Sequence, residues 1–212
     1  MTLERKIAKD LLKIKAVFLR PEDPFTWASG IKSPIYCDNR LTLSDVEVRK
    51  DVEEGIAEVI RKNFPECETV MGTATAGIAH AAIVSEILNI PMGYVRTGSK
   101  DHGRKNQIEG KCEPGTKVVV VEDLISTAGS CIDVVEVLRE AGVEVLGIVS
   151  IFTYGMKKAE TRCAEHNVKY ASCSNLDVLV EVAAEEGYIK EEDKQRLINF
   201  RNNPSDESWM NK

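Results

Sequence analysis

The sequence lacks the features that mark membrane, secreted and nucleic-acid-binding proteins. No apolar stretch approaches the roughly 20 residues that span a bilayer, and the opening segment, MTLERKIAKD, alternates in charge where a secretory signal is apolar. Lysine and arginine number 28 against 34 aspartates and glutamates, which gives a net charge of −6 without any basic run. We therefore expect a soluble, cytoplasmic protein that binds neither a membrane nor nucleic acid.

Patterns for zinc sites and for common nucleotide sites are also missing. Three histidines are too few and too scattered to complete a zinc site, and no two cysteines have the spacing that such sites use. Cys163 is the one cysteine close to a histidine, His166, in what reads as a surface turn, and we do not expect it to be a nucleophile. The motifs GxxxxGKS/T, GxGxxG and GxSxG are absent, which excludes a P-loop enzyme, a dinucleotide fingerprint and an α/β-hydrolase. The cysteines, which we expect to be reduced, are Cys37, Cys67, Cys112, Cys131, Cys163 and Cys173.

The most informative stretch that is present is VVVVEDLISTAGS, residues 118–130. Four consecutive valines predict a strand that is buried on both faces, as in a parallel sheet. An apolar stripe with helical spacing begins at Ser130 and ends at Ala141 and Gly142, before a second strand-like run, VEVLGIVSIF. The stretch therefore predicts strand, loop, helix and strand, with the loop at the edge where open α/β sheets bind ligands.

Similar patterns predict one α/β domain for the 212 residues, 43% of which are hydrophobic. The alternation of strands and helices begins near residue 68, and a polar connection at 97–110 has a length typical of functional loops. We expect three parts within one functional domain: 1–66 with a helix, a hairpin and a linking helix, 67–174 with the core, and 175–212 with C-terminal helices and a tail.

Several local signals set the expected boundaries outside the central stretch. The hairpin at 25–40 is expected to turn at Ser29 and Gly30, and a capping box of Ser44 and Glu47 is expected to start a helix that ends near residue 64. Asn175 is expected to cap the helix that follows it, and the end of the chain is expected to be disordered.

Two strand-to-helix loops are built from small residues that suit an anion. In the loop at 126–130, backbone N–H groups can converge beside the positive end of a helix. A second such loop follows the neighbouring strand and consists of Thr73, Ala74, Thr75, Ala76 and Gly77. Taken alone, each loop is compatible with an ordinary tight turn. Together they indicate a ligand with two phosphoryl groups.

Glu122 and Asp123 do not fit a purely anionic ligand. Carboxylates at the mouth of a buried strand lose hydration, and a phosphate beside them would repel them. The pair therefore indicates that something other than phosphate, such as hydroxyl donors, a metal or a developing cation, lies next to it.

At this point the motifs resemble a known family. VVVVEDLISTAGS resembles the thirteen-residue signature with which type I phosphoribosyltransferases bind 5-phosphoribosyl 1-diphosphate, and the chain from FTWASGIKSPIYCDNR through YVRTGSKDHGRKNQIEG to the signature resembles the bacterial orotate phosphoribosyltransferases. The resemblance implies a type I phosphoribosyltransferase fold, with a mostly parallel central sheet flanked by helices and a small N-terminal hood. It also implies Mg²⁺ and a homodimer in which loop 97–110 reaches the active site of the partner subunit.

The resemblance assigns roles to individual residues. Ser126 to Ser130 would hold the 5′-phosphate, and Glu122 and Asp123 would face the ribose hydroxyls and stabilise positive charge on the sugar. The implied catalytic residues are Lys100, His102, Glu122 and Asp123. The implied ligands of the phosphoribosyl donor are Arg96, Lys100, His102, Glu122, Asp123, Leu124, Ile125, Ser126, Thr127, Ala128, Gly129 and Ser130, with residues 73–77 at the diphosphate, Arg104 and Lys105 as lesser contributors, and Mg²⁺ held mainly through substrate.

Orotate also needs a partner for its carboxylate. By resemblance, Ser126 lies near the base and residues 25–40 cover it, with Lys32 and Arg40 as candidate partners. Positions where many members have another residue are Ala28, Ala76, Thr97, Tyr154 and Ala128. We expect His80 to be a packed histidine. If the backbone at Ala128 has a positive φ, its Cβ costs about 1 kcal/mol.

Two other functions remain open from the sequence. One is an enzyme of the same fold that acts on a purine or on uracil. The other is a regulator that keeps the phosphoribosyl site only to sense its ligand.

Overall fold

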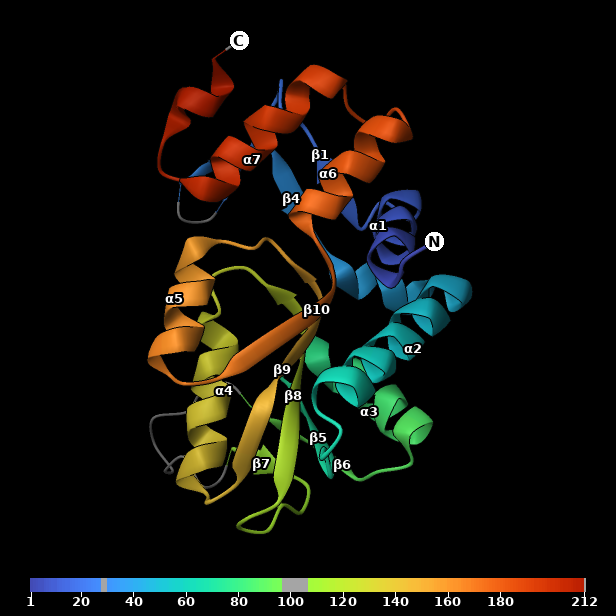
Figure 1. The fold of residues 1–212 in the computed structure, drawn as a ribbon, viewed down its shortest axis with the longest axis vertical. Coiled ribbons are helices and arrows are strands. Elements are labelled where there is room, and N and C mark those ends of the chain that lie inside the picture. The colour runs from blue at the N-terminus through green and yellow to red at the C-terminus, as the bar shows by residue number, and fades with distance from the viewer. Residues whose placement is uncertain (28–29, 97–106, 212) are drawn as a thin grey trace.

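The computed structural model describes residues 1–27, 30–96 and 107–211, and its centre is a six-stranded sheet (Figure 1). The strand order is β10-β9-β8-β5-β6-β7, and all neighbours are parallel except β6 and β7. The strands are β5 (Thr69–Thr73), β6 (Met92–Val95), β7 (Ile108–Glu109), β8 (Lys117–Ile125), β9 (Glu144–Thr153) and β10 (Lys169–Asn175). The predicted α/β fold with a mostly parallel sheet is therefore confirmed.

The valine run forms β8, in the middle of the sheet, and its side chains alternate between two hydrophobic layers. Val119 and Val121 pack with α2 (Val46–Asn63) and α3 (Ala76–Leu88), whereas Val118 and Val120 pack with α4 (Gly129–Glu140) and α5 (Lys157–Glu165). Figure 1 shows the two helix pairs on opposite faces of the sheet. A strand covered on both faces has no side that can accept polar residues, which explains its unbroken apolar run.

Strand β8 is longer than the valine run, because it continues through Glu122 and Asp123 to Ile125. It pairs with β9 as far as Ile125 and Thr153, but with β5 only as far as Val121 and Gly72. The last four residues of β8 therefore lack a neighbouring strand on the β5 side. The short loop that remains between β8 and α4 consists of residues 126–128.

The end of the sheet where the parallel strands finish is covered by a second group of elements (Figure 1). They include a short sheet of β1 and β4 and a hairpin of β2 and β3, in which the amide of Gly30 donates to the carbonyl of Trp27 at 2.8 Å. Ser29, the other residue of the predicted turn, lies outside the described residues. The bounds of these elements are α1 (Leu3–Lys13), β1 (Val17–Leu19), β2 (Phe25–Thr26), β3 (Lys32–Ser33), β4 (Ile35–Cys37), the 3₁₀ helix η1 (Asn39–Ser44), α6 (Leu176–Glu185), η3 (Glu191–Asp193), α7 (Lys194–Asn202) and η4 (Glu207–Met210).

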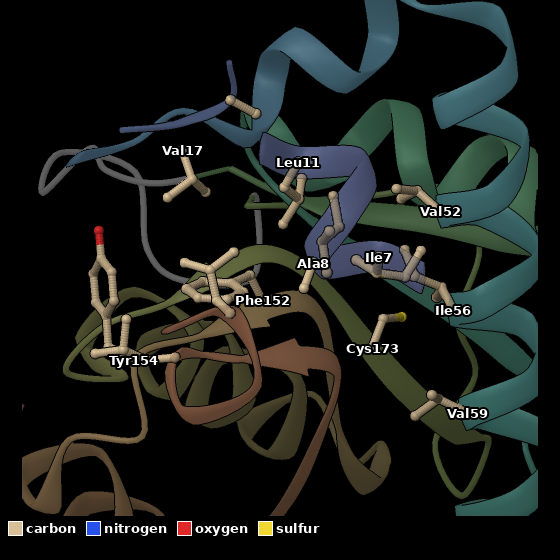
Figure 2. Close-up of a cluster of buried hydrophobic side chains, with 14 of the residues drawn as sticks. Ile7, Ala8, Leu11, Val17, Val52, Ile56, Val59, Phe152, Tyr154 and Cys173 are labelled. Atoms are coloured by element: carbon tan, nitrogen blue, oxygen red, sulfur yellow. The ribbon is translucent and has the colours of Figure 1, made fainter. Parts of the chain in front are cut away.

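One hydrophobic cluster joins these elements to the sheet (Figure 2). Ile7 and Leu11 of α1 are fully buried beside Ile56 of α2, and the cluster continues to Phe152 and Tyr154 at the end of β9. The N-terminal helix is thus part of the main core and fixes the position of the elements above the strand ends.

The structure corrects two local predictions. Helix α2 is capped by Asp45, whose Oδ1 accepts from the amides of Glu47 and Val48 at 3.1 and 3.0 Å, so Ser44 ends the preceding 3₁₀ helix instead. Cys163 is buried in α5 and does not lie in a surface turn. The cap on α6 is as predicted, because Asn175 Oδ1 accepts from the amide of Val178 at 3.0 Å.

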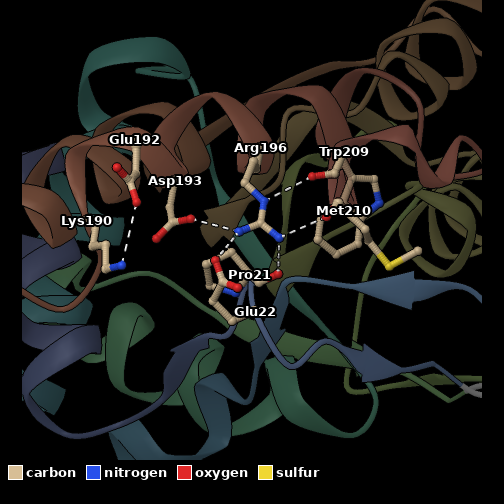
Figure 3. A network of polar contacts seen from close by, with 8 residues as sticks. All are labelled: Pro21, Glu22, Lys190, Glu192, Asp193, Arg196, Trp209 and Met210. Carbon is tan, nitrogen blue, oxygen red and sulfur yellow. Dashed lines mark hydrogen bonds and ion pairs between the residues drawn. The ribbon is translucent and has the colours of Figure 1, made fainter. Parts of the chain in front are cut away.

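The end of the chain is ordered, contrary to the prediction of a disordered tail. Arg196 of α7 donates to the carbonyl oxygen atoms of Pro21 at 2.6 Å and Trp209 at 3.1 Å, and it pairs with Asp193 and Glu22 (Figure 3). The Trp209 side chain is 2% exposed and lies edge-on against Phe200. A buried tryptophan near the end of the chain holds this segment in place, which an analysis of local composition misses.

In the described part of the chain, no helix combines the length and the apolar character that crossing a bilayer requires.

Candidate functional site

The candidate site lies where β5, β8 and β9 end, beneath the hairpin of β2 and β3. Parallel strands present their carboxyl ends at one edge, and helices α3 and α4 begin there. The hairpin reaches this edge through Trp27, whose ring stacks on Tyr154 with centroids 6.0 Å apart. The predicted loops and the acidic pair are therefore brought to one place.

Side chains from other elements complete the hydrogen bonds of β8 where β5 no longer runs beside it. In a strand, the carbonyl groups of residues i and i+2 point to the same side. The carbonyl of Val121 accepts from Thr73 Oγ1 at 3.0 Å, and the carbonyl of Asp123 accepts from Asn39 Nδ2 at 2.7 Å. The backbone of the acidic pair is thus fixed from the first loop and from the N-terminal elements.

Glu122 is buried, with 5% of its surface exposed. Its Oε1 accepts from the amide of Asp123 at 3.0 Å and its Oε2 accepts from Ser130 Oγ at 3.3 Å. Burial, followed by the neighbouring carboxyl of Asp123, raises the pKa of Glu122 to about 8. Burial and the neighbouring carboxyl therefore favour the protonated form of Glu122.

Asp123 is half-buried, and its carboxyl group reaches that of Glu122, with which it shares a side-chain hydrogen bond. Its carboxylate is close to the hood: burial raises the pKa of the Cys37 thiol and of the Tyr154 phenol, and the charge of Asp123 adds to both shifts. The acidic pair thus consists of a buried member, held by Ser130, and a half-buried member whose carboxylate lies near Glu122, Cys37 and Tyr154.

The end of β8 is fixed by β9. The carbonyl of Ile125 accepts from the amide of Tyr154 and from Thr153 Oγ1, both at 3.1 Å. Ile125 is fully buried on the face covered by α4 and α5, and Leu124 packs on the opposite face. The side chains of these two signature residues therefore belong to the core, and only their backbone lies at the loop.

The loop after β8 turns sharply at Ala128, which has φ 60° and ψ 14°. This left-handed conformation answers the question raised by the sequence, since Ala128 does carry the cost of a Cβ at positive φ. Its carbonyl accepts from the amide of Ile132 at 3.1 Å and so begins α4. No side chain among the described residues caps α4, so the amides of its first turn face the loop.

The loop after β5 is shorter than predicted, because β5 includes Thr73 and α3 begins at Ala76. Gly77 is packed so closely that an added Cβ would lie 2.3 Å from the carbonyl oxygen of Val121 and 2.7 Å from Thr73 Oγ1. Thr75 precedes α3 without a side-chain hydrogen bond to the helix. This loop, too, leaves the first amides of a helix at the sheet edge.

The predicted cationic residues fall in three places. Lys32 is exposed in the hairpin and donates to Thr26 Oγ1 at 2.8 Å. Arg40 pairs with Asp38 through Nε at 2.6 Å and Nη2 at 2.8 Å, which lowers the pKa of Asp38. Arg96 directly follows β6, and its Nε lies 3.1 Å from Glu109 Oε1. Four predicted residues, Lys100, His102, Arg104 and Lys105, lie outside the described residues.

His80 is a packed histidine, as predicted. Its Nδ1 is 2.6 Å from Glu53 Oε1, and both side chains are fully buried between α2 and α3. Burial is the main cause that raises the pKa of Glu53, and His80 opposes the shift. The contact described for this pair joins α2 to α3, and it includes no residue at the carboxyl ends of the strands.

Two residues of the site escaped the sequence analysis. Asn39 lies within a motif that was quoted for its resemblance, but nothing in the local pattern separates it from its neighbours. Arg162 lies on α5 and donates to the carbonyl and the hydroxyl of Thr127, 35 positions earlier in the chain. Both contacts join distant segments, so no spacing rule reveals them.

Mg²⁺ is the cofactor that the resemblance implies. The described residues contain no group of three or more histidine, cysteine, aspartate or glutamate side chains placed to hold a metal ion. The partly exposed carboxylate of Asp123 nevertheless offers the type of oxygen ligand that Mg²⁺ prefers. The site therefore fits an ion that is held mainly through oxygen atoms of a substrate.

Comparisons with known proteins agree on one family. Residues 44–184 match the model of the phosphoribosyl transferase domain. An orotate phosphoribosyltransferase from Bacillus cytotoxicus is 57% identical over 208 residues, which is 98% of this chain and 99% of the relative. One from Bacillus subtilis is 55% identical over 210 residues, or 99% of this chain and 97% of the relative. The crystal structure of an orotate phosphoribosyltransferase from Aeropyrum pernix matches with a TM-score of 0.75 and 32% identity, covering 86% of this chain and 99% of that one.

Proposed function

This chain belongs to the orotate phosphoribosyltransferase family, and we propose that the carboxyl edge of β5, β8 and β9 is its active site. The chain transfers the phosphoribosyl group of 5-phosphoribosyl 1-diphosphate to orotate, which gives orotidine 5′-phosphate and diphosphate in UMP biosynthesis. The observation that carries the assignment of the site is the convergence of two uncapped helix ends and a carboxylate at one edge of the sheet.

The 5′-phosphate end of the donor is assigned to residues 126–130. The left-handed turn at Ala128 directs the chain from Ser126 and Thr127 into α4, whose first turn has no side-chain cap. Such amides, together with the helix dipole, bind a phosphate without any charged side chain. The diphosphate end is assigned to residues 73–77, where α3 begins in the same way.

The two carboxyl groups have different roles in this proposal. Asp123 faces the ribose and stabilises the positive charge that develops on the sugar as diphosphate departs. Glu122 is buried and protonated, and through the amide of Asp123 and the hydroxyl of Ser130 it holds the sugar-facing segment and the phosphate-facing segment in register. Neither group acts as a nucleophile.

Mg²⁺ is proposed as the cofactor, and the carboxylate of Asp123 is the protein group that would hold it, with the other oxygen ligands supplied by substrate and water. When bound, the ion draws negative charge from the leaving group. The chain's own residues orient the ribose and hold the 5′-phosphate and the diphosphate of the donor at separate loops.

Lys100 and His102 are proposed, by resemblance, to bind the diphosphate from loop 97–110, with Arg96 at the start of the loop and Arg104 and Lys105 in support. In the same proposal the protein is a homodimer, and this loop covers the active site of the partner subunit. Closure of a loop over a reactive sugar would exclude water from the reaction.

Orotate is proposed to bind between Ser126 and the hood. Of the two candidate partners for its carboxylate, Lys32 is favoured, because it donates to a neutral hydroxyl, whereas the charge of Arg40 is already balanced by Asp38. A cytoplasmic location is also proposed, since all six cysteines are free thiols, which suits a reducing compartment.

A panel of bases tests the function. With 5-phosphoribosyl 1-diphosphate and Mg²⁺, we expect turnover of orotate, followed as loss of its absorbance, and no turnover of uracil, hypoxanthine or adenine. Use of another base in place of orotate would contradict the assignment. Donor binding without turnover of any base would indicate a ligand sensor, an alternative that the near full-length match to curated enzymes disfavours.

A further inference from the structure

A cation from a neighbouring helix holds the turn after β8. Arg162, in the last turn of α5, is partly buried, and its Nη1 donates to the carbonyl of Thr127 at 3.0 Å and to the Thr127 hydroxyl at 3.2 Å. The same Nη1 would lie 3.0 Å from a Cβ added at Gly129. The guanidinium group therefore spans the turn from Thr127 to Gly129, directly across Ala128.

These contacts act on the turn in two ways. The carbonyl of Thr127 belongs to the peptide that enters Ala128, so its bond to Arg162 holds that peptide in the orientation that the left-handed backbone at Ala128 requires. The Thr127 hydroxyl accepts from a cation and therefore directs its own proton elsewhere. In the proposed function, this proton is available to a phosphate oxygen at the loop.

A second arginine shows what a purely structural contact looks like in the same region. Arg139 of α4 donates to the carbonyls of His166 at 2.6 Å and Asn167 at 3.1 Å, and so ties α4 to the end of α5. Both arginines donate to backbone carbonyls, but Arg139 joins α4 to the residues after α5, whereas Arg162 joins α5 to the residues before α4. Among the hydrogen bonds described for these two arginines, only those of Arg162 involve the loop between β8 and α4.

We propose that Arg162 is a positioning residue for the phosphate end of the donor. It keeps the Ala128 turn in its left-handed form, aims the Thr127 hydroxyl at a phosphate oxygen, and adds a fixed positive charge beside the anion. This inference rests on the proposed function for the identity of the ligand, although the contacts that carry it do not depend on the base.

The first test measures binding of ribose 5-phosphate to the protein alone by calorimetry, with R162A, R162K and the matched control R139A. Because a hydrogen bond from a charged group is lost, R162A should bind roughly tenfold more weakly. R162K, which keeps the charge but not the planar fork, should fall between R162A and wild type. R139A should bind as wild type does, even if its thermal unfolding temperature falls.

Steady-state kinetics give a second readout that a merely structural role would not move. R162A should raise the KM for 5-phosphoribosyl 1-diphosphate by roughly tenfold and leave the KM for orotate nearly unchanged. Wild-type affinity for ribose 5-phosphate in R162A, or equal losses in R162A and R139A, would overturn the proposal. A wild-type protein that binds ribose 5-phosphate but does not use orotate would instead contradict the proposed function and leave the positioning role standing.

A double substitution tests the action on the backbone. Glycine adopts positive φ without a steric cost, so the turn in A128G needs less support from outside. In that background, R162A should weaken binding of ribose 5-phosphate by only about threefold. An undiminished tenfold loss would overturn the positioning role and assign Arg162 a direct charge contact instead.

Discussion

The two strand-to-helix loops at the sheet edge have the same topology but are held by different forces. The loop after β5 is fixed by close packing, since Gly77 leaves no space for a single carbon atom against the Val121 carbonyl. The loop after β8 is fixed by polar contacts, from Arg162 to Thr127 and from Ser130 to Glu122. Around Gly129, the nearest atom to an added Cβ is the end of a flexible arginine side chain.

This difference follows from the position of each loop in the sheet. The loop after β5 lies against β8, whose backbone cannot move because it is paired on both sides as far as Val121. The loop after β8 follows a strand end that no longer pairs with β5, so no neighbouring strand holds its backbone on the β5 side. Close packing against the backbone makes the first loop rigid. The conformation of the second loop depends on side-chain hydrogen bonds, so substitution of those side chains should change it.

The largest effect is expected from G77A. The added carbon would overlap a backbone carbonyl that is fixed in the sheet, so the free energy of unfolding should fall by about 3 kcal/mol, at the upper end for overpacking in a core. Urea unfolding followed by circular dichroism measures this. A loss below 1 kcal/mol would show that the first loop can move and that the contrast with the second loop is wrong.

D123N is expected to change activity without changing stability. The amide has the shape of the carboxylate but not its charge, and the backbone carbonyl of Asp123 keeps its bond to Asn39. We expect kcat to fall by roughly 100-fold, or about 2.7 kcal/mol, with an unaltered thermal transition. A wild-type kcat in this variant would show that the charge of Asp123 does not stabilise the transition state.

E122Q is expected to change the pH dependence of stability. The pKa of Glu122 is about 8 in the folded protein and 4.5 ordinarily, so the folded state binds more protons between these values. The stability of the wild type should therefore fall as pH rises from about 4.5 to about 8. Glutamine does not titrate, so between pH 5 and pH 9 the free energy of unfolding of the variant should rise relative to that of the wild type, by up to about 4 kcal/mol. Chemical unfolding at several pH values checks this, and parallel curves for the two proteins would contradict it.

T73V is expected to have the smaller effect of removing one buried hydrogen bond. The Val121 carbonyl loses its hydrogen bond from the Thr73 hydroxyl, so the free energy of unfolding should fall by about 1 kcal/mol.

G129A is the counterpart of G77A in the second loop. It should lower the free energy of unfolding by less than about 1 kcal/mol, because the guanidinium group of Arg162 can shift away from the added carbon. Equal losses in G77A and G129A would abolish the distinction between the two loops.

Much of the fold was predictable because it rests on local patterns. The valine run, the stripe after Ser130 and the cap at Asn175 are readable from adjacent residues, and each is confirmed. Asp45 was missed as a cap because it stands next to Ser44, another good cap, and only the helix geometry decides between them. The length of β8 was underestimated because pairing with β9, and not its own apolar run, determines where it ends.

The site was predictable in outline but not in its supporting contacts. The motif located the loops and the acidic pair, and the roles of its residues stay predictions, including those of Lys100 and His102. Which of Glu122 and Asp123 is buried depends on Ser130 and on the hood. Asn39 and Arg162 act across 84 and 35 positions of the sequence, where no local pattern exists.

The Arg196 contacts have a consequence for the order in which the chain folds during synthesis. Pro21 and Glu22 emerge from the ribosome early, but their partner Arg196 follows 174 positions after Glu22. At roughly 5–20 residues per second, the early segment waits on the order of ten seconds for it. The six-stranded sheet, whose last strand ends at Asn175, can therefore form before Arg196 ties the elements above the strand ends together.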